Sequence, residues 1–334
     1  MIVTRTPFRI SFFGGGTDYP SWFRDHGGAV IATSIDKYCY ITCRYLPPFF
    51  DHRHRIVYSR IETVQDIADI QHPSARAVLG LEDPTKGFEI HYDGDLPARS
   101  GLGTSSSFTV GLVHALSALR GQYISKEQLA SKAIHIEQDV IKENVGSQDQ
   151  ISATFGGLNR IEFRRDGTFQ VDPVILSGER LQELQDHLML FYTRIQRIAS
   201  DVAKSQIDNI KNRQKELTDM QAMVDQGITI LQDARTPISA FGDLLDECWR
   251  YKRSLSDRIS TPLIDEMYAA ARQEGGIGGK ILGAGGGGFL LLFAPPARHA
   301  AIRARLHDLV QVPFQFERSG SRVVLYQPNG LGEV

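Results

Sequence analysis

The residues with the clearest chemical potential lie between Leu96 and Gly111, where two glycines precede a run of hydroxyl side chains. Glycine has no Cβ, so the backbone at Gly101 and Gly103 can turn sharply and approach a ligand closely. Residues 88–92 predict a strand before this turn, and apolar residues from Phe108 to Leu119 recur with helical spacing after it. The hydroxyl residues at the start of that helix are Thr104, Ser105, Ser106 and Ser107.

The start of a helix is a natural anion site, because its first N–H groups have no acceptor within the helix and the helix dipole favours negative charge. A phosphate bound there gains hydrogen bonds from those N–H groups, and a serine hydroxyl can add a ligand to Mg²⁺. The same pattern also describes a plain turn followed by a capped helix. From these residues alone, both interpretations stand.

Two acidic residues further along the chain extend the first interpretation. Glu137 lies near the edge of the apolar stripe of a helix for which Ser125 to Gln128 form a capping sequence. Asp149 follows a break in that helix at residues 144–146. The two acids can reach one metal-phosphate site, whereas solvated surface charges are the alternative.

A glycine triplet at residues 14–16 predicts a second place where the backbone approaches a ligand. It follows a strand expected at residues 8–13 and precedes Thr17-Asp18-Tyr19. The Asp18 carboxylate can accept hydrogen bonds from hydroxyl groups. The alternative for this turn is a hairpin or an Asx turn.

A third glycine cluster spans residues 275–288. Gly283, Gly285 and Gly288 satisfy the spacing GxGxxG, but an apolar strand follows them where a dinucleotide fold requires a helix. A Walker A loop is also excluded, because Glu274 replaces its first glycine and Ile281 replaces its Ser or Thr. The cluster predicts a flexible loop, or one in close approach to a ligand, ahead of a buried strand.

Composition limits the class of protein. The chain has 334 residues, 42% hydrophobic and 23% charged, which is ordinary for a folded protein of two domains. A formal charge of −2 provides no general attraction to nucleic acid or to an anionic membrane. The sequence shows no signal-peptide core and no apolar run of roughly 18 residues, and Cys39, Cys43 and Cys248 lack metal-binding spacing. We expect a cytoplasmic protein that acts on small molecules.

Hydrophobic periodicity outlines the remaining elements. Further strands are expected at residues 28–34, 37–44, 157–163, 168–175, 187–192, 312–316 and 322–326. Further helices are expected at residues 62–70, 73–81, 207–231 and 297–309. The composition changes to long helices after the strand at 187–192, so a domain boundary is expected between Ser177 and Arg194.

The three glycine clusters, with an acid after the second helix, resemble the GHMP small-molecule kinase superfamily over essentially the whole chain. The three motifs of that superfamily resemble Pro7–Tyr19, Leu96–Ser107 and Lys280–Gly288. The resemblance implies an α+β, two-domain GHMP kinase fold. Its ribosomal-protein-like N-terminal domain, with the ATP-phosphate loop, is expected at residues 1–180, and its ferredoxin-like C-terminal domain, with helical insertions, at residues 181–334.

Within the superfamily, the segments Thr4–Pro20, Gly27–Val30 and Ile35–Tyr40 look like those of the D-glycero-D-manno-heptose 7-phosphate kinases. Galactokinases usually carry Gly-Glu-His before Thr-Asp-Tyr, and here Gly15 and Gly16 replace the acid and the histidine. This difference argues against galactose and leaves room for a larger sugar.

The resemblance implies ATP and Mg²⁺ as cofactors and assigns roles to individual residues. Asp149 matches the catalytic aspartate, which orients or deprotonates the attacking hydroxyl, and Arg9 matches the basic residue near that hydroxyl. Ser105 and Glu137 match the ligands of Mg²⁺. The implied ATP-phosphate loop comprises Pro97, Gly101, Leu102, Gly103, Thr104, Ser105, Ser106 and Ser107.

The expected substrate residues form two groups. The residues expected around the sugar are Gly15, Gly16, Thr17, Asp18, Tyr19, Gly285 and Gly286. A sugar phosphate also requires cations for its own phosphate, and the candidates are Lys37, Arg44, Arg194, Arg197 and Lys204.

The implied activity is ATP-dependent phosphorylation of the anomeric hydroxyl of heptose 7-phosphate, which yields heptose 1,7-bisphosphate for GDP-heptose and surface polysaccharide. An anomeric hydroxyl is more acidic than an ordinary alcohol, so a carboxylate is an adequate base. The nearest alternative is another sugar 1-kinase, acting on fucose, mannose or a uronic acid. A non-catalytic sugar sensor and a phosphate-dependent decarboxylase on the same scaffold are more distant alternatives. The expected partners are the sugar phosphate and ATP, without nucleic acid or membrane, and a homodimer is compatible with them.

Overall fold

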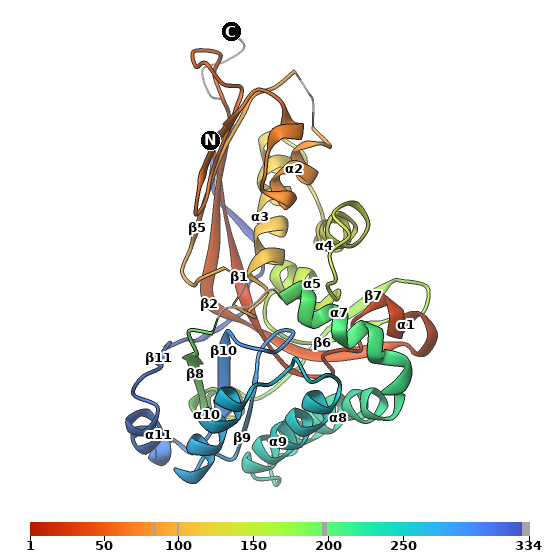
Figure 1. Cartoon of the computed structure of the whole chain (residues 1–334), viewed down its shortest axis with the longest axis vertical. Coiled ribbons are helices and arrows are strands. Elements are labelled where there is room, and N and C mark those ends of the chain that lie inside the picture. Colours follow the sequence, from red (N-terminus) through yellow and green to blue (C-terminus); the bar gives the residue numbers. More distant parts are fainter. Residues whose placement is uncertain (83–84, 99, 196–198, 329–334) are drawn as a thin grey trace.

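The computed structural model describes residues 1–82, 85–98, 100–195 and 199–328. These residues form two β-sheets with helices packed on them, and the larger sheet stands above the smaller one in Figure 1. The combination of helices with two largely antiparallel sheets confirms the α+β class expected from the sequence.

The larger sheet contains nine strands within the described residues. Its centre is the antiparallel pair β1 (Ile2–Phe13) and β2 (Gly28–Tyr45), in a register that starts with Ile2 opposite Cys43. β12 and β13 pair with β2 and β1, so a late segment of the chain completes the sheet formed by its beginning. Besides β1 and β2, the strands of this sheet are β3 (His54–Val57), β4 (Ile61–Val64), β5 (Phe88–Gly94), β6 (Leu158–Phe163), β7 (Phe169–Pro173), β12 (Phe316–Glu317) and β13 (Arg322–Tyr326).

Helices cover one face of the larger sheet (Figure 1). The central one, α3 (Thr104–Leu119), packs on β1 and β2, and it is apolar or small on nearly every side, which is typical of a helix inside a core. α4 begins with the expected capping box between Ser125 and Gln128. The helices of this part are α1 (Pro20–His26), η1 (Ile67–Asp69), α2 (Pro73–Leu79), α4 (Lys126–His135), the π-helix η2 (Ile136–Val140) and α5 (Gln148–Phe155).

The smaller sheet is antiparallel with the order β11-β8-β10-β9. Its strands are β8 (Leu188–Tyr192), β9 (Gly278–Ile281), β10 (Phe289–Phe293) and β11 (Val310–Gln311). The central strand β10 is apolar at every position and fully buried. The accompanying helices are α6 (Gly178–Asp186), α7 (Ala199–Asn209), η3 (Ile210–Asn212), α8 (Gln214–Gln232), α9 (Ser239–Ser254), α10 (Pro262–Gln273), η4 (Pro296–Arg298) and α11 (His299–Arg305).

The two sheets share one hydrophobic core. Phe241 of α9 meets Phe12 and Phe13 of β1 edge to face, with ring centroids 5.4 and 5.0 Å apart. The same ring lies 6.0 Å from that of Phe293 on β10. Aromatic contacts therefore fix the smaller sheet against the end of β1.

Four sequence expectations were wrong. The strands expected at 28–34 and 37–44 are one strand, β2, because β1 pairs with it on both sides of the gap and β12 pairs with it at Ser34 and Ile35. The helix expected at 62–70 is replaced by β4, which pairs with β3, and by the short η1. At β2 the added partner β12 is distant in the chain, whereas β3 and β4 are consecutive strands, and in both places strand pairing overrides the local pattern.

The helix expected at 207–231 is divided, because α7 ends at Asn209, η3 follows it and α8 begins at Gln214. The strand expected at 312–316 is absent at 312–315, where the chain passes from β11 of the smaller sheet to β12 of the larger one. The domain division at residue 180 stays a prediction.

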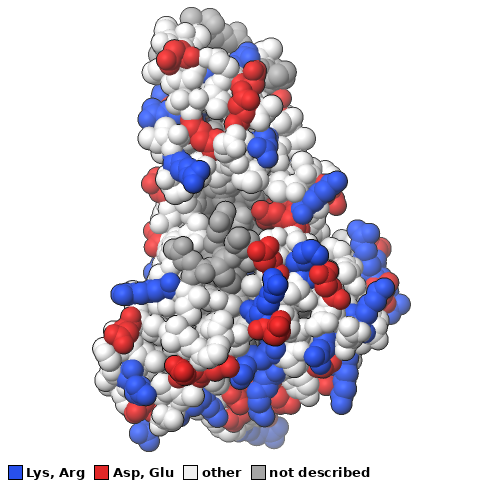
Figure 2. All heavy atoms as spheres, in the orientation of Figure 1, with Lys and Arg blue, Asp and Glu red and all other residues white. Residues whose placement is uncertain are grey.

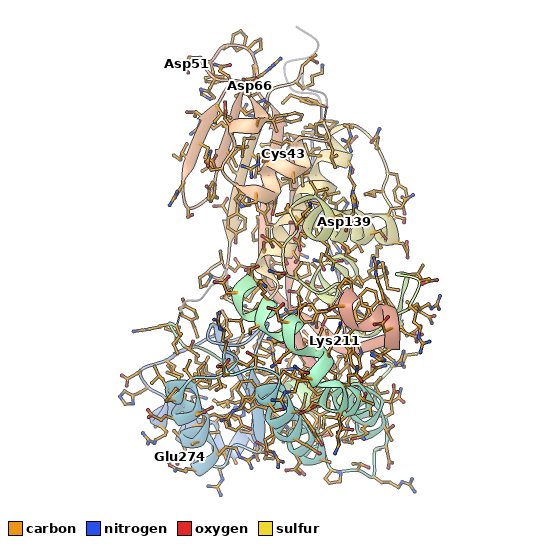
Figure 3. All side chains as sticks on the ribbon, turned by 45° about the vertical axis from the view of Figure 1, so that its right-hand side comes forward. Cys43, Asp51, Asp66, Asp139, Lys211 and Glu274 are labelled. Carbon is orange, nitrogen blue, oxygen red and sulfur yellow. The ribbon has the colours of Figure 1, made fainter. Side chains whose placement is uncertain are left out.

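Charges of both signs are mixed on the surface, and Lys and Arg lie among Asp and Glu over the face shown in Figure 2. The three cysteines are buried and free of disulfides, and Figure 3 shows Cys43 within the larger sheet, far from Glu274 at the opposite end of the molecule. Within the described ranges, the helices are all too short or too polar to span a lipid bilayer.

Candidate active site

A cleft of about 220 Å³ lies where the two sheets meet. Three turns form its walls: the glycine triplet at 14–16, the hydroxyl loop (residues 100–107) and the glycine loop (residues 282–288). The helix α7, which crosses this junction in Figure 1, also lines the cleft. Ser200 of α7 accepts from Asn144 at 3.2 Å, and Gln206 donates to the carbonyl of Ala284 at 2.5 Å. α7 therefore joins both walls.

Two opposite charges meet in the cleft, on Arg9 of β1 and Asp149 of α5. Arg9 Nη2 and Nε lie 2.7 and 2.8 Å from Asp149 Oδ1, and Nη1 donates to the carbonyl of Gly101 at 2.7 Å. Arg9 is only 3% exposed. Asp149 lies in the first turn of α5, where the helix dipole favours a carboxylate. These contacts hold the Asp149 carboxylate in one orientation beside the hydroxyl loop.

The hydroxyl loop turns through left-handed backbone at its two glycines, with φ of 88° at Gly101 and 73° at Gly103. A Cβ added at Gly103 would lie 3.4 Å from Asp149 Oδ2, so glycine leaves that oxygen accessible. The turn places the start of α3, Thr104 to Ser106, on the cleft wall. Because the first N–H groups of a helix are available to an anion, this wall can bind phosphate.

Glu137 lies behind the wall on the π-helix η2 and is 1% exposed. Ser106, which lines the cleft, donates to Glu137 Oε2 at 2.8 Å, and Gln150 donates to the same oxygen. Burial raises the pKa of Glu137 to about 7. This π-helical turn forms the end of α4, and it holds a carboxylate one hydroxyl group away from the cleft.

The oxygen donors in this corner suit Mg²⁺, which prefers oxygen ligands and binds them together with substrate phosphates. Ser105 is exposed on the cleft wall, and Glu137 is reached through Ser106. A bound cation would also offset the burial that raises the pKa of Glu137. Across the described ranges no three His, Cys, Asp or Glu side chains are grouped around one point, so the metal site stays a prediction.

Asp18 joins the glycine triplet to the turn that precedes α5. Its carboxylate accepts hydrogen bonds from Gly16 N and from Gln148 Nε2, both at 2.9 Å. Burial raises the pKa of Asp18. A Cβ added at Gly146 would lie 1.9 Å from Asp18 Oδ2, so only glycine fits there. Asp18 therefore fixes the shape of the wall and also faces the cleft.

Two buried lysines line the cleft from the side of the smaller sheet. Lys280 of β9 donates to the carbonyl of Phe12 at 2.8 Å, and burial lowers its pKa. Lys252 of α9 donates to the carbonyls of Gly283 and Ile281, at 2.5 and 3.3 Å. The lysines tie β9 to β1 and the glycine loop to α9, and they place two basic side chains beside the cleft.

The structure brings about half of the predicted site residues to the cleft. Those that line the cleft are Arg9, Gly15, Gly16, Asp18, Tyr19, Gly101, Gly103, Thr104, Ser105, Ser106 and Asp149. Four more are buried without lining it: Thr17, Leu102, Ser107 and Glu137.

Other predicted residues are not brought to the cleft. Lys37 pairs with Asp36, Arg44 with Glu89 and Lys204 with Asp208, so these cations are engaged with their own neighbours. The glycine loop faces the cleft through Gly283 and Ala284, while its next two glycines turn toward Ile259, whose carbonyl accepts from Gly286 N at 2.7 Å. Arg197 lies outside the described residues. The predicted residues away from the cleft are Lys37, Arg44, Pro97, Arg194, Lys204, Gly285 and Gly286.

The cleft also contains residues that the sequence analysis missed. Ser11 had a signal, because it follows Arg9 by two positions and so shares its face of a strand. Gln148 had one as well, because it precedes Asp149. Lys252 had no sequence signal that would assign it to the cleft, since it is one of several cations on an amphipathic helix. The missed residues with polar or charged side chains are Ser11, Glu143, Asn144, Gln148, Ser200, Gln206, Lys252 and Lys280.

Comparison with protein families gives two matches. The profile of the GHMP kinases N terminal domain matches residues 69–157, which include the hydroxyl loop, Glu137 and Asp149. The profile of the GHMP kinases C terminal domain matches residues 232–310, which include Lys252, Lys280 and the glycine loop. The two matches cover most of the residues that form the cleft.

Relatives and solved structures agree with these matches. D-glycero-alpha-D-manno-heptose 7-phosphate kinase of Campylobacter jejuni is 28% identical over 307 residues, covering 89% of this chain and 90% of that protein. A bifunctional fucokinase/GDP-fucose pyrophosphorylase of Arabidopsis thaliana is 25% identical over 90% of this chain, which spans 31% of that protein. A D-glycero-D-manno-heptose 1-phosphate kinase structure from Bacteroides thetaiotaomicron superposes with a TM-score of 0.78 at 21% identity, over 97% of this chain and 98% of that one. The structural likeness establishes the two-domain fold.

Proposed function

The chain belongs to the GHMP kinases, and from this premise we propose that it transfers the γ-phosphoryl group of ATP to the anomeric hydroxyl of D-glycero-D-manno-heptose 7-phosphate. The product is heptose 1,7-bisphosphate, which leads to GDP-heptose and surface polysaccharide. The observation that carries the proposal is the Arg9–Asp149 pair beside a helix start rich in hydroxyls. Similarity to a heptose 7-phosphate kinase over most of both chains supports the choice of sugar.

Phosphoryl transfer requires positioning and charge compensation more than covalent participation of the protein. The N–H groups at the start of α3, with the hydroxyls of Thr104 and Ser105, bind phosphate oxygens. Arg9 holds Asp149 through Oδ1, and Gly103 leaves Oδ2 accessible. Asp149 Oδ2 therefore accepts the proton of the attacking hydroxyl.

Ser105 and Glu137 would hold Mg²⁺, whose chemistry when bound is to neutralise charge on the phosphates. Lys252 and Lys280 place basic side chains on the opposite side of the cleft, and bound anionic substrates would favour their charged forms. Because ATP is the donor, the proposal places the protein in the cytoplasm, and it is compatible with a homodimer.

A second candidate is a sugar 1-kinase for a different sugar. The observation that favours it is the similarity, over 90% of this chain, to a bifunctional protein with fucokinase activity in its name. The cations expected to hold the 7-phosphate also lie away from the cleft. In this second candidate, the substrate is a sugar that carries no phosphate.

Formation of ADP from ATP, measured with each sugar of a panel, tests both candidates. The panel contains heptose 7-phosphate, heptose, fucose, mannose and a uronic acid, each with ATP and Mg²⁺. We expect the highest kcat/KM with heptose 7-phosphate. Equal values for heptose with and without its phosphate would contradict recognition of the phosphate, and preference for fucose or mannose would select the second candidate.

A further inference from the structure

Two oxygen atoms in the cleft have no part in the mechanism above. Ser11 Oγ and Gln148 Oε1 are buried, and neither has a hydrogen-bond partner in the described part of the chain. Ser11 is 5% exposed and Gln148 is 9% exposed, and both residues line the cleft. Because nearly all buried polar atoms in folded proteins are hydrogen-bonded, two such atoms beside one cleft point to a partner that binds there.

Hydrogen bonds set the orientation of the Gln148 amide. Its Nε2 donates to Asp18 Oδ2 at 2.9 Å, and its backbone N lies 3.4 Å from the same oxygen. The flipped amide would place Oε1 against a carboxylate, where two acceptors repel each other. Oε1 is therefore the atom of this side chain that can accept a hydrogen bond from a ligand.

Gly15 keeps open the space that both side chains border. A Cβ added at Gly15 would lie 3.9 Å from Ser11 Oγ and 3.9 Å from Gln148 Nε2. The residues that border this space are close in the sequence to the reacting groups, Arg9 and Asp149. Ser11 follows Arg9 by two positions on the same strand, and Gln148 directly precedes Asp149. A sugar that presents its anomeric hydroxyl to Asp149 therefore presents other hydroxyls to this space.

We propose that Ser11 and Gln148 bind hydroxyl groups of the sugar beside the hydroxyl that is phosphorylated, and that they determine which sugar is accepted. The inference rests on the proposed kinase function and names the residues that recognise its substrate. Gln148 Oε1 accepts a hydrogen bond from one hydroxyl, while Ser11 Oγ donates to or accepts from another. A sugar that lacks either hydroxyl leaves a buried oxygen unpaired, which discriminates strongly against it.

Ser11→Ala tests the first contact. We expect the KM for the sugar to rise about tenfold, because one hydrogen bond to substrate is lost, while the KM for ATP is unchanged. Thermal stability stays the same or rises, because the variant removes a buried hydroxyl that has no partner within the described residues. A serine with only a structural role would lower stability and leave the KM for the sugar unchanged.

Ser152→Ala is the matched control. Ser152 lies on α5 with Gln148, is 3% exposed, and has an Oγ that also lacks a partner among the residues described. It is not among the residues that line the cleft. We expect it to affect stability as Ser11→Ala does and to change neither KM.

Gln148→Lys tests the second contact, because lysine retains a donor for Asp18 and removes the acceptor oxygen. We expect the KM for the sugar to rise about tenfold or more. We also expect the ratio of kcat/KM between the preferred sugar and a deoxy analogue to fall, because the variant no longer rejects the missing hydroxyl.

These measurements separate the inference from the proposed function. A higher KM for the sugar in both cleft variants, with Ser152→Ala unchanged, supports the inference. If the unaltered protein phosphorylates a sugar and Ser11→Ala matches Ser152→Ala in both KM values, the assignment of Ser11 is overturned and the kinase proposal stands. If the unaltered protein binds ATP and phosphorylates no sugar in the panel, the proposed function fails and the inference fails with it.

Discussion

The hydroxyl loop and the glycine loop are both rich in glycine, and they touch each other, yet they differ in what they present to the cleft. A Cβ added at Gly283 would lie 2.6 Å from Gly101 Cα, and one added at Gly288 would lie 2.1 Å from the carbonyl oxygen of Ser100. The hydroxyl loop lines the cleft with hydroxyls and a helix start, whereas most glycines of the glycine loop face protein.

The element that follows each loop explains the difference. A helix leaves its first N–H groups available, so the hydroxyl loop ends in groups that can bind an anion. The strand β10 instead uses its backbone N–H and C=O groups in pairing with β8 and β9. At its start, the carbonyl of Phe289 accepts a hydrogen bond from Leu282 N at 2.9 Å. Glycine therefore serves binding in one loop and close packing in the other.

The largest expected effect is a loss of kcat when the catalytic carboxylate beside the hydroxyl loop is replaced. Asp149→Asn removes the proton acceptor beside Gly103 and keeps the shape of the side chain. We expect kcat to fall by about 10²- to 10⁴-fold while ATP still binds. Steady-state kinetics and nucleotide titration measure the two quantities.

The control for this variant is Asp139→Asn, since Asp139, labelled in Figure 3, is an exposed acid. Its carboxylate pairs with His135. We expect it to leave kcat unchanged. Normal turnover in Asp149→Asn would remove Asp149 from its role.

The second prediction concerns Glu137, behind the hydroxyl loop. Its pKa is raised from the ordinary 4.5 to about 7, so between these values the folded protein holds a proton that the unfolded chain releases. Stability in metal-free buffer should therefore fall as pH rises from 4.5 to 7 and then level off. Glu137→Gln should remove this dependence and be more stable than the unaltered protein above pH 7 by on the order of 3 kcal/mol.

Denaturant unfolding from pH 4.5 to 8 measures the Glu137 effect. Parallel pH profiles for the two proteins would contradict it. With Mg²⁺ and ATP, the unaltered protein should gain more stability at pH 8 than Glu137→Gln does, because binding favours the ionised carboxylate.

The third prediction sharpens the packing role of the glycine loop. Gly283→Ala forces a Cβ against Gly101, so we expect a loss of stability by about 1–3 kcal/mol beyond backbone strain and a lower kcat/KM. Gly121→Ala is the matched control, because Gly121 also has φ of 68° but nothing within 4 Å of an added Cβ. Equal losses in the two variants would show that strain alone, and not contact between the loops, sets the effect.

The smallest expected effect concerns one hydroxyl of the hydroxyl loop. Ser105→Ala should raise the Mg²⁺ concentration for half-maximal activity by about tenfold, because a ligand of the metal is lost. Stability should change little, since Ser105 is exposed. Ser105→Thr keeps a hydroxyl and should restore much of the Mg²⁺ response, and equal responses of the Ala and Thr variants would argue against ligation.

Several elements were predictable because their signals are local. The capping sequence at Ser125 and the strand at 322–326 match the structure closely. So does the turn into α3, where glycine is required at Gly103. The helix expected at 62–70 was wrong, because residues 61–64 form a hairpin with β3 and only Ile67–Asp69 are helical, which hydrophobic periodicity did not indicate.

The sequence by itself determined the family, the α+β class and the residues at the heart of the cleft, because glycine turns, helix starts and their neighbouring acids lie in short, contiguous motifs. The tertiary structure alone decided which charges meet. It brings Lys252 and Lys280 to the cleft, pairs Arg44 with Glu89 away from it, and sets Gln148 against Asp18. Contacts between residues far apart in the chain depend on how sheets and helices pack, and no short motif records that.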